Sequence, residues 1–270
     1  MNKKWLVTPY FIWSTLFVLI PLGMVFYYGF TDKSGAFTLE NILAITSPEH
    51  IKSLWLAMLL SFISTIICIL LAYPLAMILS FSNRKHGSFL VLICILPMWM
   101  NFLLRTLAWQ TLLEKTGVIN AILAFLNLPT LDIINTPYAI ILGMVYNFLP
   151  FMILPIYNNL SKIDVNVINA AYDLGANFFQ ILLKIIIPLS IPGVISGITM
   201  VFVPALTTFV ISNLLGGSKI LLIGNVIEQE FTQASNWNLG SGLSIVLMVF
   251  ILISIVVSTI CDKDGEGSSL

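Results

Sequence analysis

Residues 169–188 read Asn-Ala-Ala-Tyr-Asp-Leu-Gly-Ala-Asn-Phe-Phe-Gln-Ile-Leu-Leu-Lys-Ile-Ile-Ile-Pro, an amphipathic stretch in a chain built mostly of long apolar blocks. Just before it, Asp164 is suited to cap the N-terminus of a helix, and Gly175 is suited to end that helix in a left-handed conformation. One face of this predicted helix carries residues at helical spacing, namely Val167, Ala170, Ala171, Leu174 and Phe178. We therefore expect an L-shaped pair of short helices, the second running from about Asn177 to a break at Pro188.

The composition is that of a membrane protein. Hydrophobic residues make up 59% of the 270 residues and charged residues only 9%, whereas a soluble domain carries about 25% charged residues. The formal net charge is zero, which argues against a nucleic-acid partner. Cys68, Cys94 and Cys261 have neither the spacing of a disulfide framework nor that of a metal site, so we interpret them as small apolar side chains.

Six apolar blocks are long enough to cross a bilayer, which takes about 20 residues each. They occupy roughly residues 6–30, 54–81, 88–109, 137–160, 185–212 and 239–260. Backbone polar groups in lipid must be hydrogen-bonded within the protein, so each block should be a helix. Kinks are expected at the prolines within or beside the blocks, Pro9, Pro21, Pro97, Pro150, Pro155, Pro192 and Pro204. We predict an all-helical, six-span membrane protein that forms a single domain over residues 1–270.

The distribution of cations predicts that both termini are cytosolic. The first block continues well past the length of a signal peptide, so we interpret it as a retained span. The short turn at residues 83–87 carries two cations and no acid, and short cationic loops favour the cytosolic side. The opposite side is then net acidic, with Asp32, Glu40, Glu49, Glu114, Asp132, Glu228 and Glu230. These acidic residues either form an ordinary solvated surface or weakly attract a cationic solute or carrier. The sequence leaves both interpretations open.

The amphipathic stretch is expected to dock on another protein. Helices that lie on a bilayer are usually rich in Lys and Arg on their polar face, whereas this one carries Asn, Asp and Gln. Ala170 and Ala171 are small enough to let a partner surface approach closely, and Gly175 provides the bend. A helix lying on lipid is the alternative.

The spacing of small residues in this stretch resembles the "EAA" loop of permeases from ABC-type importers, the loop that docks on a nucleotide-hydrolysing subunit. Ala170 and Ala171 are followed by three residues and Gly175, and Pro188 stands near the end of the pattern. Asn169 occupies the position where that family has Glu, so whatever this carboxylate does in relatives does not carry over.

Three further stretches are similar to permeases of polyamine (spermidine/putrescine) importers: residues 214–227, 97–105 and 149–155. The resemblance implies the type I, MetI-like importer fold in a bacterial inner membrane. It also implies a second permease of the PotC type, two copies of a PotA-type ATPase that would hold ATP and Mg, and an external PotD-type polyamine-binding protein. Coupling to the ATPase is implied for helices at about 164–184, and in particular for Asn169, Ala170, Ala171, Asp173, Gly175 and Pro188.

The chain itself shows no signature of an enzyme. Residues 216–219 read Gly-Gly-Ser-Lys but lack the spacing of a phosphate-binding loop, and neither a nucleophile–base pattern nor a metal-ligand cluster is present. The cores of the apolar blocks hold no Asp, Glu or Lys, whereas ion-coupled carriers normally keep an intramembrane carboxylate. The function classes left open are a permease for another small solute, a channel-like six-span protein and a secondary-carrier subunit.

Polar and aromatic residues in or beside the blocks are candidates to line a solute pathway. Trp99 is foremost because it follows Pro97 at a predicted helix break, and an indole face attracts an alkylammonium by roughly 0.5–2 kcal/mol. An interfacial aromatic belt is the alternative interpretation of Trp99. The other candidates are Asn101, Tyr146, Asn147, Thr207 and Thr208, with Ser196, Thr199, Ser212 and Asn213 in addition.

Arg105 is the charged residue nearest to a block core. We expect its side chain to extend to the outer headgroups, with a role in gating as the alternative. Because a polyamine carries several positive charges and these blocks hold no carboxylate, we also expect the partner permease to supply the acids of the pathway.

Overall fold

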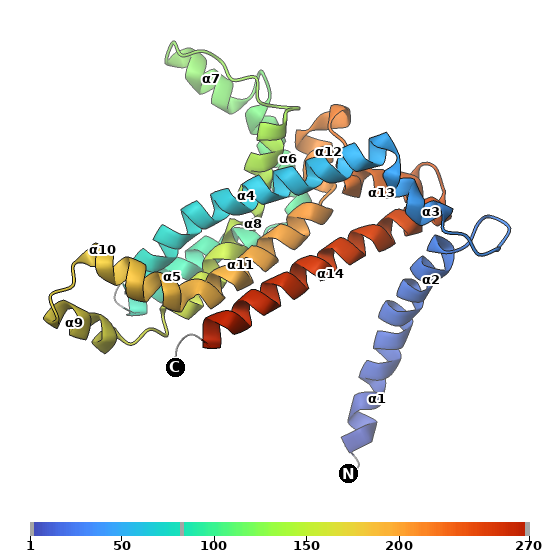
Figure 1. The fold of residues 1–270 in the computed structure, drawn as a ribbon. Coiled ribbons are helices and arrows are strands. Elements are labelled where there is room, and N and C mark those ends of the chain that lie inside the picture. Colours follow the sequence, from blue (N-terminus) through green and yellow to red (C-terminus); the bar gives the residue numbers. More distant parts are fainter. Residues whose placement is uncertain (1–2, 82–83, 268–270) are drawn as a thin grey trace.

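The computed structural model describes residues 3–81 and 84–267 and is nearly all helical in these ranges. Figure 1 shows long helices that run side by side as a tilted bundle, with α9 and α10 at one end and α3 at the other. Five helices are long and apolar enough to cross a membrane, and a sixth span forms if one bent helix pair is counted as a single crossing. The predicted all-helical, six-span membrane fold is confirmed.

The centre of the bundle is built by α4 (Pro48–Phe81), α8 (Pro137–Leu160) and α11 (Ile187–Thr207). Small residues let these helices approach closely, as is common between membrane helices. A Cβ added at Gly197 of α11 would lie 2.5 Å from Sδ of Met152 on α8. On α4, Ala57, Ala72 and Ala76 are fully buried against the neighbouring helices. Small residues that face the core therefore set how closely these three helices pack.

The N-terminal span leaves this bundle. It consists of α1 (Lys3–Ser14), a π-helical turn (Thr15–Leu19) and α2 (Ile20–Gly29). In the most apolar 18-residue window of this span, within Pro9–Gly29, no residue is buried by the rest of the chain. Figure 1 shows that α2 meets the bundle at its C-terminal end, beside α14 (Trp237–Gly267), and that α1 diverges from it. The wider π turn lies directly before Pro21, where the ring removes one helical donor.

Side-chain amides fix the end of the bundle where α2, α14 and α3 (Glu40–Leu43) meet. Asn41 and Asn238 both donate to the backbone carbonyl of Thr31, at 2.9 and 2.6 Å. A Cβ at Gly242 would approach the carbonyl of Asn41 to 2.5 Å, so only glycine fits there. A 3-10 turn (Ala44–Thr46) then leads into α4.

The third span is broken. Helix α5 (Arg84–Ile95) tightens into a 3-10 turn (Leu96–Trp99), and α6 (Phe102–Leu113) and α7 (Val118–Phe125) follow. The two parts are bent by 88°. The helical segment continues through Pro97, which lies in the 3-10 turn, and the break comes three residues later than predicted, at Met100, whose backbone is extended. Asn101 starts the new helix by accepting from the N–H groups of Leu103 and Leu104 at 2.9 and 3.2 Å. The basic turn at residues 83–87, used to predict orientation, begins in a segment outside the described residues.

The fifth span differs from its prediction at both ends. Residues 178–207 form one continuous helix, in which α10 (Phe178–Ile181), a π turn (Leu182–Ile186) and α11 follow without interruption. The predicted break at Pro188 is therefore wrong. Ile187 donates to the carbonyl of Leu182, five residues back, and this wider turn accommodates the missing N–H of Pro188. At the other end the helix stops at Thr207 rather than continuing to residue 212, because Thr208 is extended.

One buried amide holds the chain beyond this break. Helix α12 (Val210–Leu215) and a 3-10 turn (Gly217–Lys219) lead to α13 (Ile223–Thr232). Asn225 of α13 is fully buried. Its side chain contacts Ser212, the backbone N–H of Leu222, the carbonyl of Phe209 and the side chain of Asn213, all within 3.1 Å. The carbonyl of Phe209 also accepts from the backbone N–H of Asn213 at 2.9 Å, so Asn225 ties α13 to the start of α12.

Replacing this amide should destabilise the protein. In Asn225→Ala several buried groups lose their partner, and each costs about 1–3 kcal/mol, so we expect a loss of about 2–4 kcal/mol. The thermal midpoint of the purified membrane protein, followed by tryptophan fluorescence, should fall. Gln233→Ala, at an exposed position just after α13, is the matched control and should leave the midpoint unchanged. Equal midpoints for both variants would contradict the role of Asn225.

Candidate functional site

The first candidate site is the coupling segment, residues 164–188, at one end of the bundle (Figure 1). Asp164 caps α9 (Val165–Asp173) by accepting from the N–H of Asn166 at 2.9 Å, as predicted. Gly175 ends it with φ of 82°, the left-handed conformation expected from the sequence. Asn177 and Gln180 then form a reciprocal capping box at the start of α10, both bonds being 2.9 Å. The predicted pair of short helices is confirmed, although the second continues into the span.

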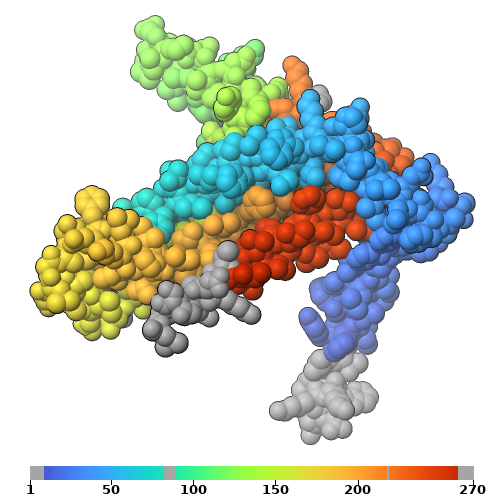
Figure 2. Space-filling model, viewed as in Figure 1, coloured from blue at the N-terminus to red at the C-terminus, as the bar shows by residue number. Residues whose placement is uncertain are grey.

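The predicted apolar face of α9 is divided between two environments. Ala171 is buried against the bundle, whereas Val167 and Ala170 are exposed. Leu174 is the extreme case, because 88% of its side-chain surface is exposed. The other residues assigned to coupling, Asn169, Asp173, Gly175 and Pro188, are also exposed. Figure 2 shows the segment as a projection beyond the ends of the long helices.

A cavity of about 520 Å³ separates α9 from the bundle. Its wall is mostly apolar and comes from the last turns of α4 and from the coupling segment, with Met77, Ile78, Ser80, Phe81, Val165, Ile168, Tyr172, Phe178, Ile181 and Ile186. Since few close-packed contacts cross this space, α9 can shift relative to α4 without breaking a packed core.

The second candidate site surrounds the broken third span. Trp99 lies on the 3-10 turn at the bend and is 77% exposed. Asn101 is engaged as the helix cap, so its side-chain oxygen is used by the backbone. Tyr146 of α8 packs edge-on against Trp109 with ring centroids 5.1 Å apart. Asn147 is buried and donates to the carbonyl of Gly143, within its own helix, at 2.8 Å.

The prediction that Arg105 extends to the headgroups is wrong. Its side chain is only 6% exposed and donates through Nη1 to the carbonyl of Pro97 at 2.9 Å. The guanidinium also lies over the rings of Phe102 and Tyr146, at 6.0 and 5.9 Å. The same carbonyl accepts from the backbone N–H of Met100 at 3.2 Å, so Arg105 adds a second hydrogen bond to the 3-10 turn at the bend. Its Nε is buried with no hydrogen-bond partner among the described residues.

The third candidate site lies beyond the end of α11. Thr207 contributes to the lining of a cavity of about 460 Å³, and Thr208 is buried beside it. The cavity lies between the end of α11, α13 and α14, and its other lining residues are Phe209, Gly224, Ile227, Glu228, Phe231, Thr232, Ser244, Leu247, Met248 and Ile251. Glu228 accepts from Oγ1 of Thr232 at 3.0 Å. This subunit therefore holds a carboxylate in a cavity that is otherwise aromatic, aliphatic and hydroxylic.

Sequence reasoning missed this acid because it counted Glu228 among the loop charges outside the spans. A signal was present: Gly224, Ile227, Glu228 and Phe231 recur at the spacing of one helical face, and all four line the cavity. The six leading pathway candidates thus fall into two groups. One surrounds the bend near Arg105, and the other adjoins the cavity of Glu228. Ser196 and Thr199 lie within α11, and Ser212 and Asn213 contact Asn225.

A family model described as "Binding-protein-dependent transport system inner membrane component" matches residues 3–262. The chain belongs to this family. The spermidine/putrescine transport system permease protein PotB of Haemophilus influenzae is 39% identical, with 94% of this chain and 92% of that protein covered. PotB of Escherichia coli is 36% identical, with 91% and 92% covered. The resemblance to polyamine-importer permeases is confirmed, and membership identifies a membrane transport component rather than an enzyme, a channel or a secondary carrier.

Solved structures show the same fold. A chain of the bacterial alginate ABC transporter, solved in complex with an alginate pentasaccharide-bound periplasmic protein, matches with a TM-score of 0.79 and covers 94% of this chain and 91% of its own length. A chain of the MetNI methionine ABC transporter in an inward-facing conformation matches with a TM-score of 0.59, covering 80% and 95%. Both are 16% identical in sequence. The predicted type I importer permease fold is confirmed.

The geometry at Gly175 yields a prediction about the bend. A Cβ at this residue meets no atom within 4 Å, so a substitution is opposed by its left-handed backbone and not by crowding within the chain. We expect Gly175→Ala to destabilise the bend by about 1–2 kcal/mol, and Gly175→Asn to cost less because Asn tolerates this conformation. Limited proteolysis of the segment in the purified complex should be faster for Ala than for Asn. Equal rates in both variants would show that the left-handed bend is not required.

Proposed function

We propose that this chain is one permease subunit of an ATP-driven importer for polyamines such as spermidine and putrescine. Family membership and the names of its relatives support transport of this substrate class. The cavity of Glu228 is the structural observation that favours it. A polyamine is an aliphatic chain with ammonium groups. The cavity offers one carboxylate, the rings of Phe209 and Phe231, and aliphatic walls that match both parts.

The proposed path uses both groups of pathway residues. Trp99 is the exposed aromatic face at the bend, and Thr207 and Glu228 belong to the cavity beyond α11. Desolvating an ammonium group is costly unless a charged or polar group compensates it. A carboxylate in this subunit means that the partner permease does not have to supply every acid of the path, in contrast to the sequence expectation.

A second permease of the PotC type is the proposed partner within the membrane. The N-terminal span supports this assignment, because it separates from its own bundle and leaves its apolar surface uncovered (Figures 1 and 2). A neighbouring subunit between α1 and α14 would cover that surface. An external binding protein of the PotD type would deliver the polyamine to the α3 end of the bundle.

The coupling segment is the proposed docking site for one copy of a PotA-type ATPase, and a second copy would dock on the partner permease. The two ATPase copies would bind ATP and Mg, and no cofactor is assigned to this chain. Exposure of Asn169, Ala170, Asp173 and Leu174 supports this role. The C-terminal end of α14 lies toward the same end of the bundle as α9 (Figure 1), which agrees with cytosolic termini in a bacterial inner membrane.

The docking proposal predicts the effect of a charge on the most exposed apolar side chain of the segment. Leu174→Asp should place an unpaired carboxylate in the interface, so co-purification of the ATPase with the permease should fall sharply while the permease still inserts. Leu39→Asp is the matched control, because Leu39 is an exposed leucine at the opposite end of the bundle. Undiminished ATPase recovery with Leu174→Asp would remove α9 from the interface.

The substrate proposal predicts a difference between two glutamates on one helix. Glu228→Gln should lower polyamine uptake about tenfold, the order of magnitude of one lost charged hydrogen bond. Glu230→Gln should have little effect, because Glu230 does not line the cavity. Uptake of radiolabelled spermidine into vesicles that contain the whole complex, at equal ATPase content, is the measurement. Equal losses in both variants would exclude the cavity from the path.

A further inference from the structure

Residues 114–134, which we call the α7 arm, lie apart from the helix bundle. The arm follows α6 and contains α7 and the loop that returns to α8. Figure 1 shows α7 extending sideways from the bundle, and Figure 2 shows that the rest of the chain leaves the arm uncovered on the visible face. The arm is therefore an appendage whose surface requires its own explanation.

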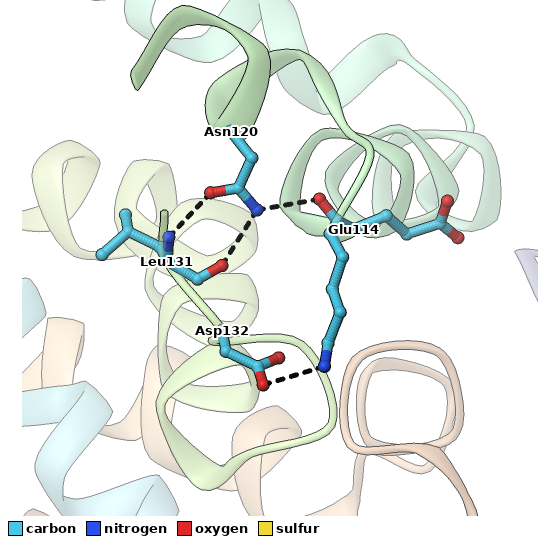
Figure 3. Close-up of polar contacts among 5 residues, drawn as sticks. Glu114, Asn120, Leu131 and Asp132 are labelled. Carbon is cyan, nitrogen blue, oxygen red and sulfur yellow. Dashed lines mark hydrogen bonds and ion pairs between the residues drawn. The ribbon is translucent and has the colours of Figure 1, made fainter. Parts of the chain in front are cut away.

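Internal polar contacts hold the arm in one shape (Figure 3). The buried side chain of Asn120 donates to the carbonyls of Glu114 and Leu131, at 3.1 and 2.9 Å, and accepts from the N–H of Leu131 at 2.7 Å. Lys115 and Asp132 form an ion pair of 3.1 Å at the base of the arm. These contacts show that the arm has a fixed conformation and that its one helical amide points inward.

The outward surface of α7 is entirely apolar. Its exposed residues, with the cap residue that follows, are Val118, Ala121, Ile122, Ala124, Phe125 and Leu126. At 100° per residue they cover an arc of about 200°. Phe125 is 86% exposed. A helix with this surface is not stable facing water, since a water-facing helix normally carries polar residues on its outer side.

We propose that the α7 arm inserts its apolar surface into the lipid leaflet on the side opposite α9. The arm is continuous with α6, whose Leu103 and Leu104 are exposed on the membrane-spanning part of the chain. A protein partner would cover one face of α7, whereas acyl chains can cover an arc of more than half a turn. The charged groups of Lys115 and Asp132 are confined to the base, where headgroups and water solvate them.

This insertion gives the broken third span a lateral anchor. The backbone N–H of Asn135, just after the arm, donates to the carbonyl of Leu215 at 2.8 Å. The arm is thereby tied to α12, which follows the break in the fifth span. Contact of α7 with the bilayer therefore fixes the depth in the membrane of the breaks in the third and fifth spans. This inference requires only that the chain belongs to a family of membrane transport components. The assignment of the leaflet opposite α9 as the outer leaflet rests on the proposed function.

The depth of the arm can be measured in the whole complex in vesicles. In a variant without the three native cysteines, single cysteines at Ile122, Leu104 or Lys33 carry an environment-sensitive NBD fluorophore. Leu104 is an exposed leucine on α6 and serves as the reference for a position expected to face lipid, and Lys33 is an exposed position in the loop after α2. We expect the Ile122 label to emit at short wavelength, and to lose as much fluorescence in phosphatidylcholine brominated on its acyl chains as the Leu104 label does. The Lys33 label should be insensitive to bromine.

Two outcomes would overturn the proposal. If the Ile122 label behaves like the Lys33 label until the external binding protein is added, α7 is a docking surface for that protein. If it is shielded from aqueous iodide but insensitive to brominated lipid, another subunit covers it. The measurement does not use transport, so a failure of polyamine uptake would count against the proposed function and leave the position of the arm to the fluorescence data.

Discussion

The structure depends on the requirement that backbone polar groups be hydrogen-bonded wherever water is absent. Two spans are interrupted, and each interruption leaves carbonyl or N–H groups without a helical partner. At the third span Arg105 binds the carbonyl of Pro97 and Asn101 takes two N–H groups. After the fifth span, Asn225 accepts from the N–H of Leu222 at the start of α13 and donates to the carbonyl of Phe209, which also accepts from the N–H of Asn213. Polar side chains thus make irregular backbone possible inside a membrane protein.

The two interruptions are also where the candidate pathway residues lie. Trp99 is exposed because the helix turns away at the bend, and Thr207 reaches the cavity of Glu228 because the helix ends there. A straight helix would present these side chains to lipid or to a packed neighbour. The leading pathway candidates, Trp99 and Thr207, and the irregular backbone therefore coincide in this chain.

Much of this could be inferred from the sequence, because lipid leaves so few alternatives to helices. Asp164 as a cap, Gly175 as a left-handed bend and a break close to Pro97 all follow from local backbone chemistry. Local rules failed where tertiary contacts decide. A π turn accommodates Pro188, and the side chain of Arg105 turns inward to the carbonyl of Pro97, 8 residues away. The roles assigned to the coupling and pathway residues stay predictions.

The continuity of residues 178–207 has a mechanical consequence. The helix measures about 45 Å at 1.5 Å per residue, and it joins the bend after Gly175 to the cavity beside Thr207. A continuous helix transmits axial displacement from one end to the other because no flexible segment interrupts it. Its one irregular turn, at residues 182–186, is the place where the helical twist can change. If the proposed docking of the ATPase displaces the coupling segment, the displacement would reach the cavity as a translation of the whole helix, and this turn would set how much twist accompanies it.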